Sequence, residues 1–189
     1  MIGLRWDDLD YENREISINH AVIYRVMENG KAEFHVSTPK TKAGKRKIPM
    51  MEAVYQAFRD EYEAQKESGF NIEICDGMSG FVFANRNGGL HNPANINRAI
   101  RRIYEAYNAE EIIKAKKEKR VPILIPHFSC HHMRHTFCTR LCEVEENIKV
   151  AQDIMGHADV STTLNIYAEA SDTAKLQAVN NMQKIFDIF

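Results

Sequence analysis

The chain has 189 residues, of which 44% are hydrophobic, and its formal net charge at pH 7 is −1. This length fits one domain with a sizeable core, no apolar run approaches membrane-spanning length, and the first residues do not have the pattern of a signal peptide. The four cysteines lack the spacing of a disulfide framework, which is typical of a reducing cytosol. We therefore expect a soluble cytoplasmic protein and exclude the membrane and disulfide-rich secreted classes.

The first part of the chain has the alternation of β-strands. Apolar residues alternate over residues 16–26 and again over 32–36, and Asn29-Gly30 between them is a strong hairpin signal. A third short strand is predicted at 46–49, and residues 38–46 before it form a second predicted hairpin. These segments predict a small three-stranded antiparallel sheet. With the helices that follow, they indicate an α+β fold that is mainly α-helical.

Helical spacing then dominates the sequence. Residues 51–68 have this spacing, with Gly69 as the stop, and a longer helix is predicted to begin near Pro93 and to run at least to Tyr107. We expect the longer helix to have a basic outward face and an apolar inward face. The outward residues are Arg98, Arg101 and Arg102, and the inward residues are Ile96, Ile100, Ile103 and Tyr104.

Four more helices are predicted toward the C-terminus. One surrounds His131, a short one covers residues 148–155 and ends at Gly156, and the next covers 161–168 with Asp159 or Ser161 as its cap. The last, over 171–189, is amphipathic and must bury an apolar stripe. That stripe either packs on its own domain or docks on a neighbouring protomer.

Charged residues are segregated along the chain. One basic run lies within residues 40–47 and a second within 98–120, whereas acids gather in three other segments. Each run taken alone is most simply a solvated surface, but together they indicate a two-faced molecule with one face suited to a polyanion. The residues expected to bind DNA phosphates on that face are Lys42, Lys45, Arg46, Arg98, Arg101 and Arg102.

His131 and Arg134 are three residues apart on a predicted helix, so both side chains leave one face and can converge on one anion. Arg supplies a planar fork of donors for phosphate oxygens, and His supplies a proton carrier near neutral pH. Gly156-His157 follows, and Tyr167 lies ten residues after His157. A tyrosine becomes a nucleophile where cations stabilise its phenolate. A His-x-x-Arg pair by itself is more often part of a solvated helix face, and a single tyrosine is more often a half-buried core residue. The combination of these residues predicts a phosphate-processing site.

A zinc cluster is the competing interpretation of the same segment. We reject it, because the segment has no Cys-x-x-Cys pair and a metal ion would occupy the site of the phosphate. His132 and His135 are assigned structural or peripheral roles, because only His131 stands three residues before Arg134. The cluster would comprise Cys130, His131, His132, His135 and Cys138.

The sequence His-x-x-Arg-His-Thr-Phe, then Met-Gly-His-Ala-Asp-Val-Ser-Thr-Thr and Tyr167, resembles the catalytic half of the tyrosine recombinases, the phage-type integrases. The resemblance implies site-specific recombination or integration of double-stranded DNA through a 3′-phosphotyrosine, without metal, ATP or another cofactor. It implies Tyr167 as the nucleophile, Arg134 and His157 as phosphate ligands, and His131 as an aid to proton transfer. It also implies self-association on DNA, as a tetramer in the full-length enzyme, and a bacterial or phage-encoded mobile element.

Two more segments are interpreted through this resemblance. The hairpin at 38–46 resembles the one that carries the family's catalytic lysine; Lys40 matches that lysine best, with Lys42 and Lys45 as alternatives. Residues 1–10 resemble the segment that follows the first catalytic arginine. Arg5 lacks the Arg-x-x-Glu context of that arginine, so we interpret it as a surface or structural residue. We accordingly expect the 189-residue chain by itself to be an N-terminally truncated catalytic domain with weak or no activity.

Two other functions stay open at this point. A type IB topoisomerase uses the same chemistry to relax DNA, although the Gly-His-to-Tyr segment is more similar to integrases. A DNA-binding module that keeps the fold without turnover is the second alternative. Cleavage of a suicide DNA substrate distinguishes a catalytic protein from a binding module.

Overall fold

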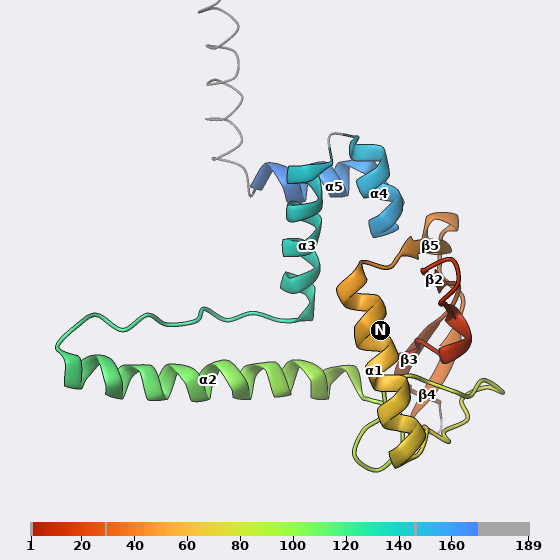
Figure 1. The fold of residues 1–189 in the computed structure, drawn as a ribbon, viewed down its shortest axis with the longest axis horizontal. Helices are drawn as coiled ribbons and strands as arrows, with labels where there is room; N and C mark the ends of the chain where they lie inside the picture. Colours follow the sequence, from red (N-terminus) through yellow and green to blue (C-terminus); the bar gives the residue numbers. More distant parts are fainter. Residues whose placement is uncertain (1, 29, 146, 170–189) are drawn as a thin grey trace, which may run out of the picture. The chain divides into compact units, whose positions relative to one another are not determined.

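The computed structural model describes residues 2–28, 30–145 and 147–169, and its ribbon is drawn in Figure 1. The chain divides into two compact units, Met1–Cys130 and His131–Phe189. The predicted helix at 171–189 lies outside the described residues.

The first unit contains two small antiparallel sheets. In the three-stranded sheet the order is β1-β2-β5, with Leu9 opposite Ile16 and Ile16 opposite Ile48. In the two-stranded sheet β3 pairs with β4, and Val22 lies opposite Val36. The strands are β1 (Leu9–Asp10), β2 (Glu15–Ile18), β3 (Ala21–Val26), β4 (Ala32–Ser37) and β5 (Arg46–Pro49).

The α+β class is confirmed, but the make-up of the predicted sheet is wrong. The alternating segment 16–26 is two strands that separate at Asn19-His20 and enter different sheets. His20 Nε2 lies 2.6 Å from the carbonyl oxygen of Gly3, and Asn19 Nδ2 donates to Asp8 at 3.3 Å. These side chains bond to the N-terminal segment instead of continuing a ladder. The alternation runs through the break unchanged, so the pattern alone does not reveal it.

The segment at 38–46 is not a hairpin either. Its flanking strands, β4 and β5, pair with β3 and β2 respectively, so the segment crosses from one sheet to the other. It contains a single 3-10 turn, η2 (Lys42–Gly44), in which Thr41 Oγ1 accepts the backbone N–H of Gly44 at 3.2 Å. A Cβ atom at Gly44 would lie 2.5 Å from Cβ of Pro39, so the turn needs glycine there.

Helix α1 (Glu52–Ser68) and its stop agree with prediction, because Gly69 adopts φ +103° and its N–H bonds to the carbonyl of Gln65. Helix α2 (Pro93–Glu118) starts at the predicted proline, with the Asn92 side chain accepting the N–H of Ala94 at 2.9 Å. An Asn cap followed by proline in the first turn is a strong helix start.

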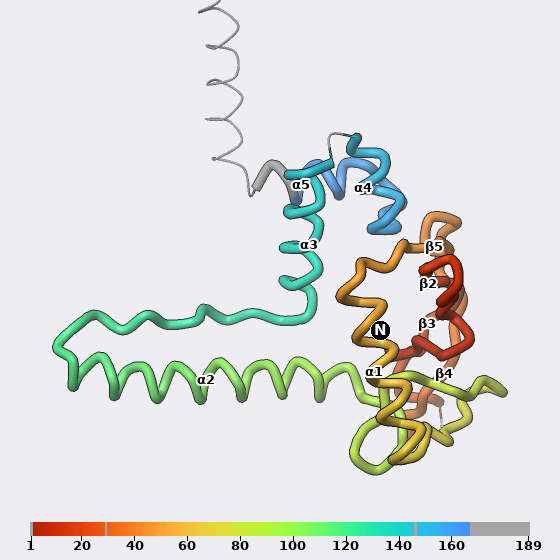
Figure 2. The backbone as a smooth tube through the Cα atoms, in the orientation of Figure 1, coloured from red at the N-terminus to blue at the C-terminus, as the bar shows by residue number. Residues whose placement is uncertain are grey.

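After α2 the chain turns back and runs beside the helix, as the tube in Figure 2 shows. Asn108 holds this return segment by bonding both backbone groups of Ile125, each at 2.8 Å. Glu111 accepts the N–H of Ile123 at 2.9 Å and a two-pronged contact from Arg120. Asn108 and Glu111 lie one helical turn apart on α2. Their side chains thus make backbone hydrogen bonds to this segment of the kind that a neighbouring β-strand would otherwise make.

The predicted faces of α2 are correct with one exception. Arg98, Arg101 and Arg102 are exposed and Tyr104 is buried, but the side chain of Ile103 is 65% exposed. Ile103 and Tyr104 are neighbours about 100° apart around the helix, so both cannot lie at the centre of one face. Both residues are apolar and belong to one broad apolar stripe, so the sequence does not show that Tyr104 is buried and Ile103 is exposed.

Phe81 and Val82 link the two cores of the first unit. Phe81 is completely buried in a cluster with Ile2 and Val22, whereas Val82 is completely buried in a cluster with Leu9 and Met50. Successive side chains of an extended backbone point in opposite directions. This short apolar run therefore fills both cores.

Up to residue 169, the described part of the second unit has three helices around a small core. Helix α4 ends at Gly156, which adopts φ +68°, and Asp159 Oδ1 caps the next helix by accepting the N–H of Ser161 at 2.9 Å, one of the two predicted caps. The core contains Cys138, Cys142, Ala151 and Met155. The helices are α3 (Cys130–Val144), α4 (Ile148–Met155) and α5 (Val160–Glu169). No helix in the described part of the chain is both long and apolar enough to cross a membrane.

Candidate active site

Arg134 lies on the exposed side of α3, and its guanidinium donates to the carbonyl oxygen of Met155. Met155 is the last residue of α4 and directly precedes the Gly156-His157 turn. The orphan carbonyl of a helix C-terminus is a natural acceptor for a cation. This contact holds the predicted phosphate-binding arginine next to the turn that carries the second predicted phosphate ligand.

His131 makes a contact that the sequence analysis did not assign. Its Nε2 lies 3.1 Å from Nε2 of His135, one helical turn later, and the two ring centroids are 4.5 Å apart. In such a contact one ring nitrogen donates a hydrogen bond and the other accepts it. The structure therefore joins His131 to His135, and joins Arg134 to Met155.

His157 follows the left-handed Gly156 and is bonded from both flanking helices. From α4, the side chain of Gln152 donates to the carbonyl oxygen of His157 at 2.9 Å. From α5, Oγ1 of Thr163 lies 3.0 Å from Nδ1 of the ring. The position of this imidazole is thus determined by short-range polar contacts within the second unit.

Tyr167 belongs to α5, the helix that starts three residues after His157. Thr163 stands one helical turn before it, and is itself bonded to His157. The structure describes the backbone of Tyr167 and not its side chain. Its helix is therefore connected to the His157 turn through Thr163.

Lys40 lies in the first unit, in the exposed segment between β4 and η2. Lys40, Lys42 and Lys45 are exposed and form no ion pair among the described residues. Lys47 differs, because its Nζ binds Glu15 at 2.7 Å, and this hydrogen bond raises the pKa of the lysine. Arg46 is half-buried and donates to the carbonyl of Gly44 at 3.2 Å, within its own turn.

The predicted basic face of α2 borders two shallow cavities. A cavity of about 730 Å³ is lined by Arg86, Arg98 and Arg102, and a neighbouring one of about 470 Å³ by Arg98 and Arg101. None of these four arginines has an ion-pair partner within the described residues. Arg120, at the other end of the helix, is by contrast paired with Glu111 and Glu118.

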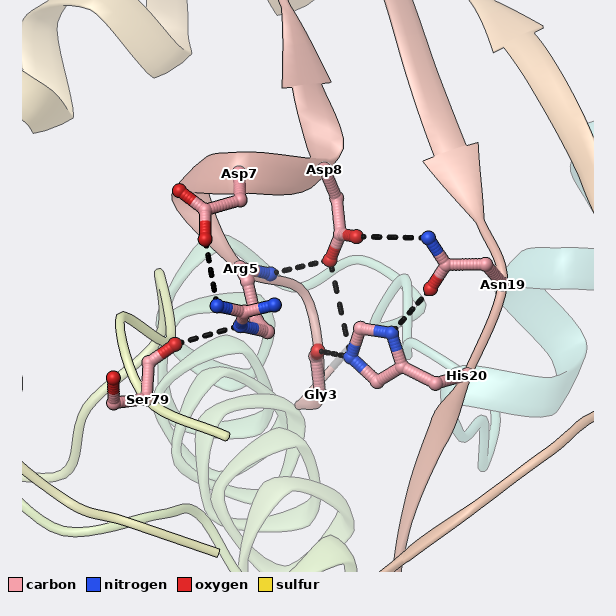
Figure 3. Close-up of polar contacts among 7 residues, drawn as sticks. All are labelled: Gly3, Arg5, Asp7, Asp8, Asn19, His20 and Ser79. Atoms are coloured by element: carbon pink, nitrogen blue, oxygen red, sulfur yellow. Dashed lines mark hydrogen bonds and ion pairs between the residues drawn. The ribbon is translucent and has the colours of Figure 1, made fainter. Parts of the chain in front are cut away.

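Arg5 has a structural role, in agreement with its interpretation from the sequence (Figure 3). Its Nε donates to the carbonyl of Ser79 at 2.6 Å, and its guanidinium pairs with Asp7 at 2.6 Å. Its backbone N–H bonds to the buried carboxylate of Asp8, which Asn19 and His20 approach from the other side. The guanidinium of Arg5 thus anchors the N-terminal segment to the 79–81 loop.

Two cysteines of α3, Cys138 and Cys142, pack as apolar groups in the core of the second unit. Burial raises the pKa of Cys138, and raises that of Cys142 to about 11, so both are thiols at neutral pH. Among the described residues, no group of three or more His, Cys, Asp or Glu side chains is arranged to hold a metal ion.

The model of the phage integrase family matches residues 1–174 of the chain. The chain belongs to the phage integrase family. The transposase of transposon Tn916 from Enterococcus faecalis is 36% identical over 182 residues, which are 96% of this chain and 41% of that protein. The integrase of Staphylococcus phage L54a is 24% identical over 187 residues, covering 98% of this chain and 47% of the other.

Solved structures show the same relationship. The Tn1549 transposon integrase in complex with a circular intermediate DNA matches with a TM-score of 0.73 and 35% identity, over 96% of this chain and 52% of the other. This integrase chain therefore spans about half the length of the relatives it matches. The α+β, mainly helical fold expected from the sequence is confirmed by this likeness.

The sequence did not predict the contacts of three polar residues near the integrase motifs: His135, Gln152 and Thr163. His135 received a structural or peripheral role, because only His131 stands three residues before Arg134. Gln152 and Thr163 lie five residues before and six residues after His157. A polar residue on an otherwise apolar helix face was the available signal for Gln152, since α4 is the most strongly amphipathic of the helices.

Proposed function

We propose that this chain is the catalytic domain of an enzyme that performs site-specific recombination by cleaving and rejoining double-stranded DNA through a 3′-phosphotyrosine. The observation that carries the proposal is the fixing of Arg134 to the Met155 carbonyl, beside His157 and in the same unit as the helix of Tyr167. Membership in the phage integrase family supports it, as do relatives that are a transposon transposase and a phage integrase.

In the proposed reaction, the Tyr167 oxygen attacks a DNA phosphorus, the bond to the 5′-oxygen breaks, and that oxygen leaves with a proton. Negative charge develops on the non-bridging oxygens, where Arg134 and His157 stabilise it more strongly than in the ground state. We assign the proton to Lys40, and assign His131 an assisting role in proton transfer. Attack by a 5′-hydroxyl on the phosphotyrosine restores the phosphodiester, so the bond energy is conserved without ATP.

The partner we propose is double-stranded DNA, bound through phosphates by two basic groups of the first unit. Lys42, Lys45, Arg98, Arg101 and Arg102 are exposed and form no ion pair in the described part of the chain, which supports their availability to an external polyanion. We include Arg46 as a neighbour of this group. The DNA complexes of the Tn1549 integrase support the same partner.

The setting that fits this activity is the cytoplasm of a bacterium, with the protein encoded by a transposon or phage. Relatives from a transposon and from a phage support this setting. Recombination joins four DNA strands, so we propose that the full-length enzyme works as a tetramer assembled on DNA.

The deciding experiment uses a suicide DNA duplex, nicked so that the strand downstream of cleavage diffuses away. The full-length wild-type recombinase should accumulate a covalent protein–DNA adduct, whereas its Tyr167→Phe variant should form none and still bind DNA. An adduct of normal yield with Tyr167→Phe would mean that another residue attacks. Binding without any adduct from the wild type would favour the DNA-binding module.

The same proteins separate recombination from topoisomerase activity. We expect strand exchange between two matched sites and no relaxation of supercoiled plasmids that lack a site. Relaxation of any supercoiled plasmid at the same rate would favour the topoisomerase.

A further inference from the structure

Gln152 of α4 makes three hydrogen bonds to the turn that carries His157. Its carbonyl oxygen accepts the backbone N–H groups of Gly156 and His157, at 2.8 and 3.2 Å. Both bonds are expected where a helix ends on a left-handed glycine. The side chain adds a third bond, from Nε2 to the carbonyl oxygen of His157 at 2.9 Å.

The amide of Gln152 has one favoured orientation. Its Oε1 accepts from Nζ of Lys149 at 3.0 Å, while its Nε2 faces the His157 carbonyl. The flipped amide would place an oxygen against that carbonyl and an N–H₂ group against an ammonium, so it is excluded electrostatically. Because Gln152 is only 6% exposed, water cannot replace these bonds at low cost.

Thr163 holds the imidazole itself. Its side chain is completely buried, and its hydroxyl lies 3.0 Å from Nδ1 of His157. A buried hydroxyl proton needs an acceptor, and among the described residues Nδ1 is the group this hydroxyl bonds. The hydroxyl then donates, Nδ1 carries the lone pair, and the proton of the neutral ring is on Nε2.

We propose that Gln152 and Thr163 are positioning residues that present Nε2–H of His157 to a non-bridging oxygen of the scissile phosphate. The inference rests on the proposed recombinase function. Gln152 sets the backbone of the turn, and Thr163 sets the tautomer and the plane of the ring. Thr163 also stands one helical turn before Tyr167 on α5, so the same bond fixes the register of the nucleophile's helix against the histidine.

The first test measures single-turnover adduct formation on the suicide duplex, in the intact recombinase. Thr163→Val keeps the volume and removes the hydroxyl, and should slow the adduct by about tenfold or more, less than the ~100-fold or more expected when a phosphate donor is lost. Thr163→Ser restores the hydroxyl and should recover most of the rate. The matched control is Thr162→Val, on the exposed neighbouring position, which should behave as the wild type. Equal rates for Thr163→Val and wild type would overturn the inference.

A double-mutant comparison separates positioning from general destabilisation. In a His157→Ala background, Thr163→Val and Gln152→Met should each slow the reaction by less than about twofold, because residues acting through one group are non-additive. A loss of the same factor in both backgrounds would assign these residues to packing alone. Circular dichroism melting of each variant checks that the fold is retained.

A second measurement does not depend on activity. In nitrogen-15 spectra of the histidine rings, His157 should show a protonated Nε2 and an Nδ1 that accepts a hydrogen bond, and the Nδ1 signal should shift in Thr163→Val. A protonated Nδ1 in the neutral wild-type ring would overturn the tautomer assignment. If the ring behaves as expected and the wild type forms no Tyr167 adduct, then the proposed function fails and the positioning of His157 stands.

Discussion

The three exposed lysines between β4 and β5 are chemically alike, and their surroundings do not rank them. Lys40 precedes the η2 turn, Lys42 opens it and Lys45 follows it. All three lack an ion-pair partner among the described residues, whereas Lys47 is bonded to Glu15. A general acid must give up its proton during the reaction, and the carboxylate of Glu15 raises the pKa of Lys47 and makes that lysine a poorer donor. The choice of Lys40 thus depends on its match to the family's lysine.

We predict that Lys40→Met slows cleavage of an ordinary DNA substrate by about 10²-fold or more, the usual contribution of a general acid. The defect should nearly disappear on a substrate whose 5′-bridging oxygen is replaced by sulfur, because a thiolate leaves without needing a proton. Single-turnover adduct formation on both substrates measures this. Lys42→Met and Lys45→Met are the matched controls; a sulfur-rescued defect in either would transfer the role to that residue.

At the scale of elements, the return segment after α2 depends on polar anchors. Glu111 binds Arg120 through both carboxylate oxygens and also accepts the N–H of Ile123. The hydrogen bonds from Arg120 and Ile123 lower the pKa of Glu111 to about 2. A carboxyl group with a lowered pKa stabilises the folded state while it is ionised.

We predict that Glu111→Gln lowers the melting temperature at pH 7 and that this difference shrinks as the pH falls. The stabilisation is complete above the ordinary glutamate pKa, near 4.3, and is lost as the pH falls toward about 2, because the folded-state carboxylate is then protonated. Thermal melts of both proteins from pH 7 to pH 3 measure the effect. Glu110→Gln, on the exposed neighbouring position, is the control. A difference in melting temperature that is constant with pH would show that the carboxylate charge is not the cause.

The connection between β4 and β5 allows a second prediction at this scale. Replacing Lys42, Lys45 and Arg46 together by glutamine should weaken DNA binding about equally for all sequences. It should also reduce the slope of log affinity against log salt by about one per lost phosphate contact. Fluorescence anisotropy across a salt series measures this slope. The control removes three charges outside both basic runs of the first unit, at the exposed residues Arg25, Arg59 and Lys66. An equal change in both triple variants would indicate net charge instead of local contact.

At the scale of the whole molecule, a net charge of −1 is compatible with DNA binding because several basic residues without an ion pair in the described part of the chain are grouped, at Lys40, Lys42 and Lys45 and at Arg98, Arg101 and Arg102. Acidic residues neutralise other cations locally, as Glu52 does for Arg14 and Glu143 for Arg140. The total charge therefore says little about the surface that a polyanion would meet.

The stretch 171–189 leads to a prediction for the whole protein. We expect this amphipathic segment to dock on a neighbouring protomer. Deleting residues 173–189 should then leave a stable, soluble protein that binds DNA but forms fewer multimeric complexes, as measured by sedimentation with and without DNA. Loss of soluble folded protein at every concentration would instead indicate that the segment belongs to the core of its own domain.

Local signals in the sequence determined most of the elements and the order of the motifs. Gly69, Pro93 and Gly156 mark helix ends because their backbone preferences act within a few residues, and all three positions agree with the structure. The family was likewise readable from one short segment, because residue type and spacing there are specific.

Tertiary structure alone decided which strands pair and which side chains meet. The alternation over 16–26 is the same for one strand or for two, and the break at Asn19-His20 is stabilised by contacts to residues 3–8. The bond between Thr163 and His157 joins α5 to the turn before it, and that between Arg134 and Met155 joins α3 to α4, at distances along the chain that no periodicity predicts. Helix and turn propensities act over one or two turns, whereas these contacts depend on how the helices pack.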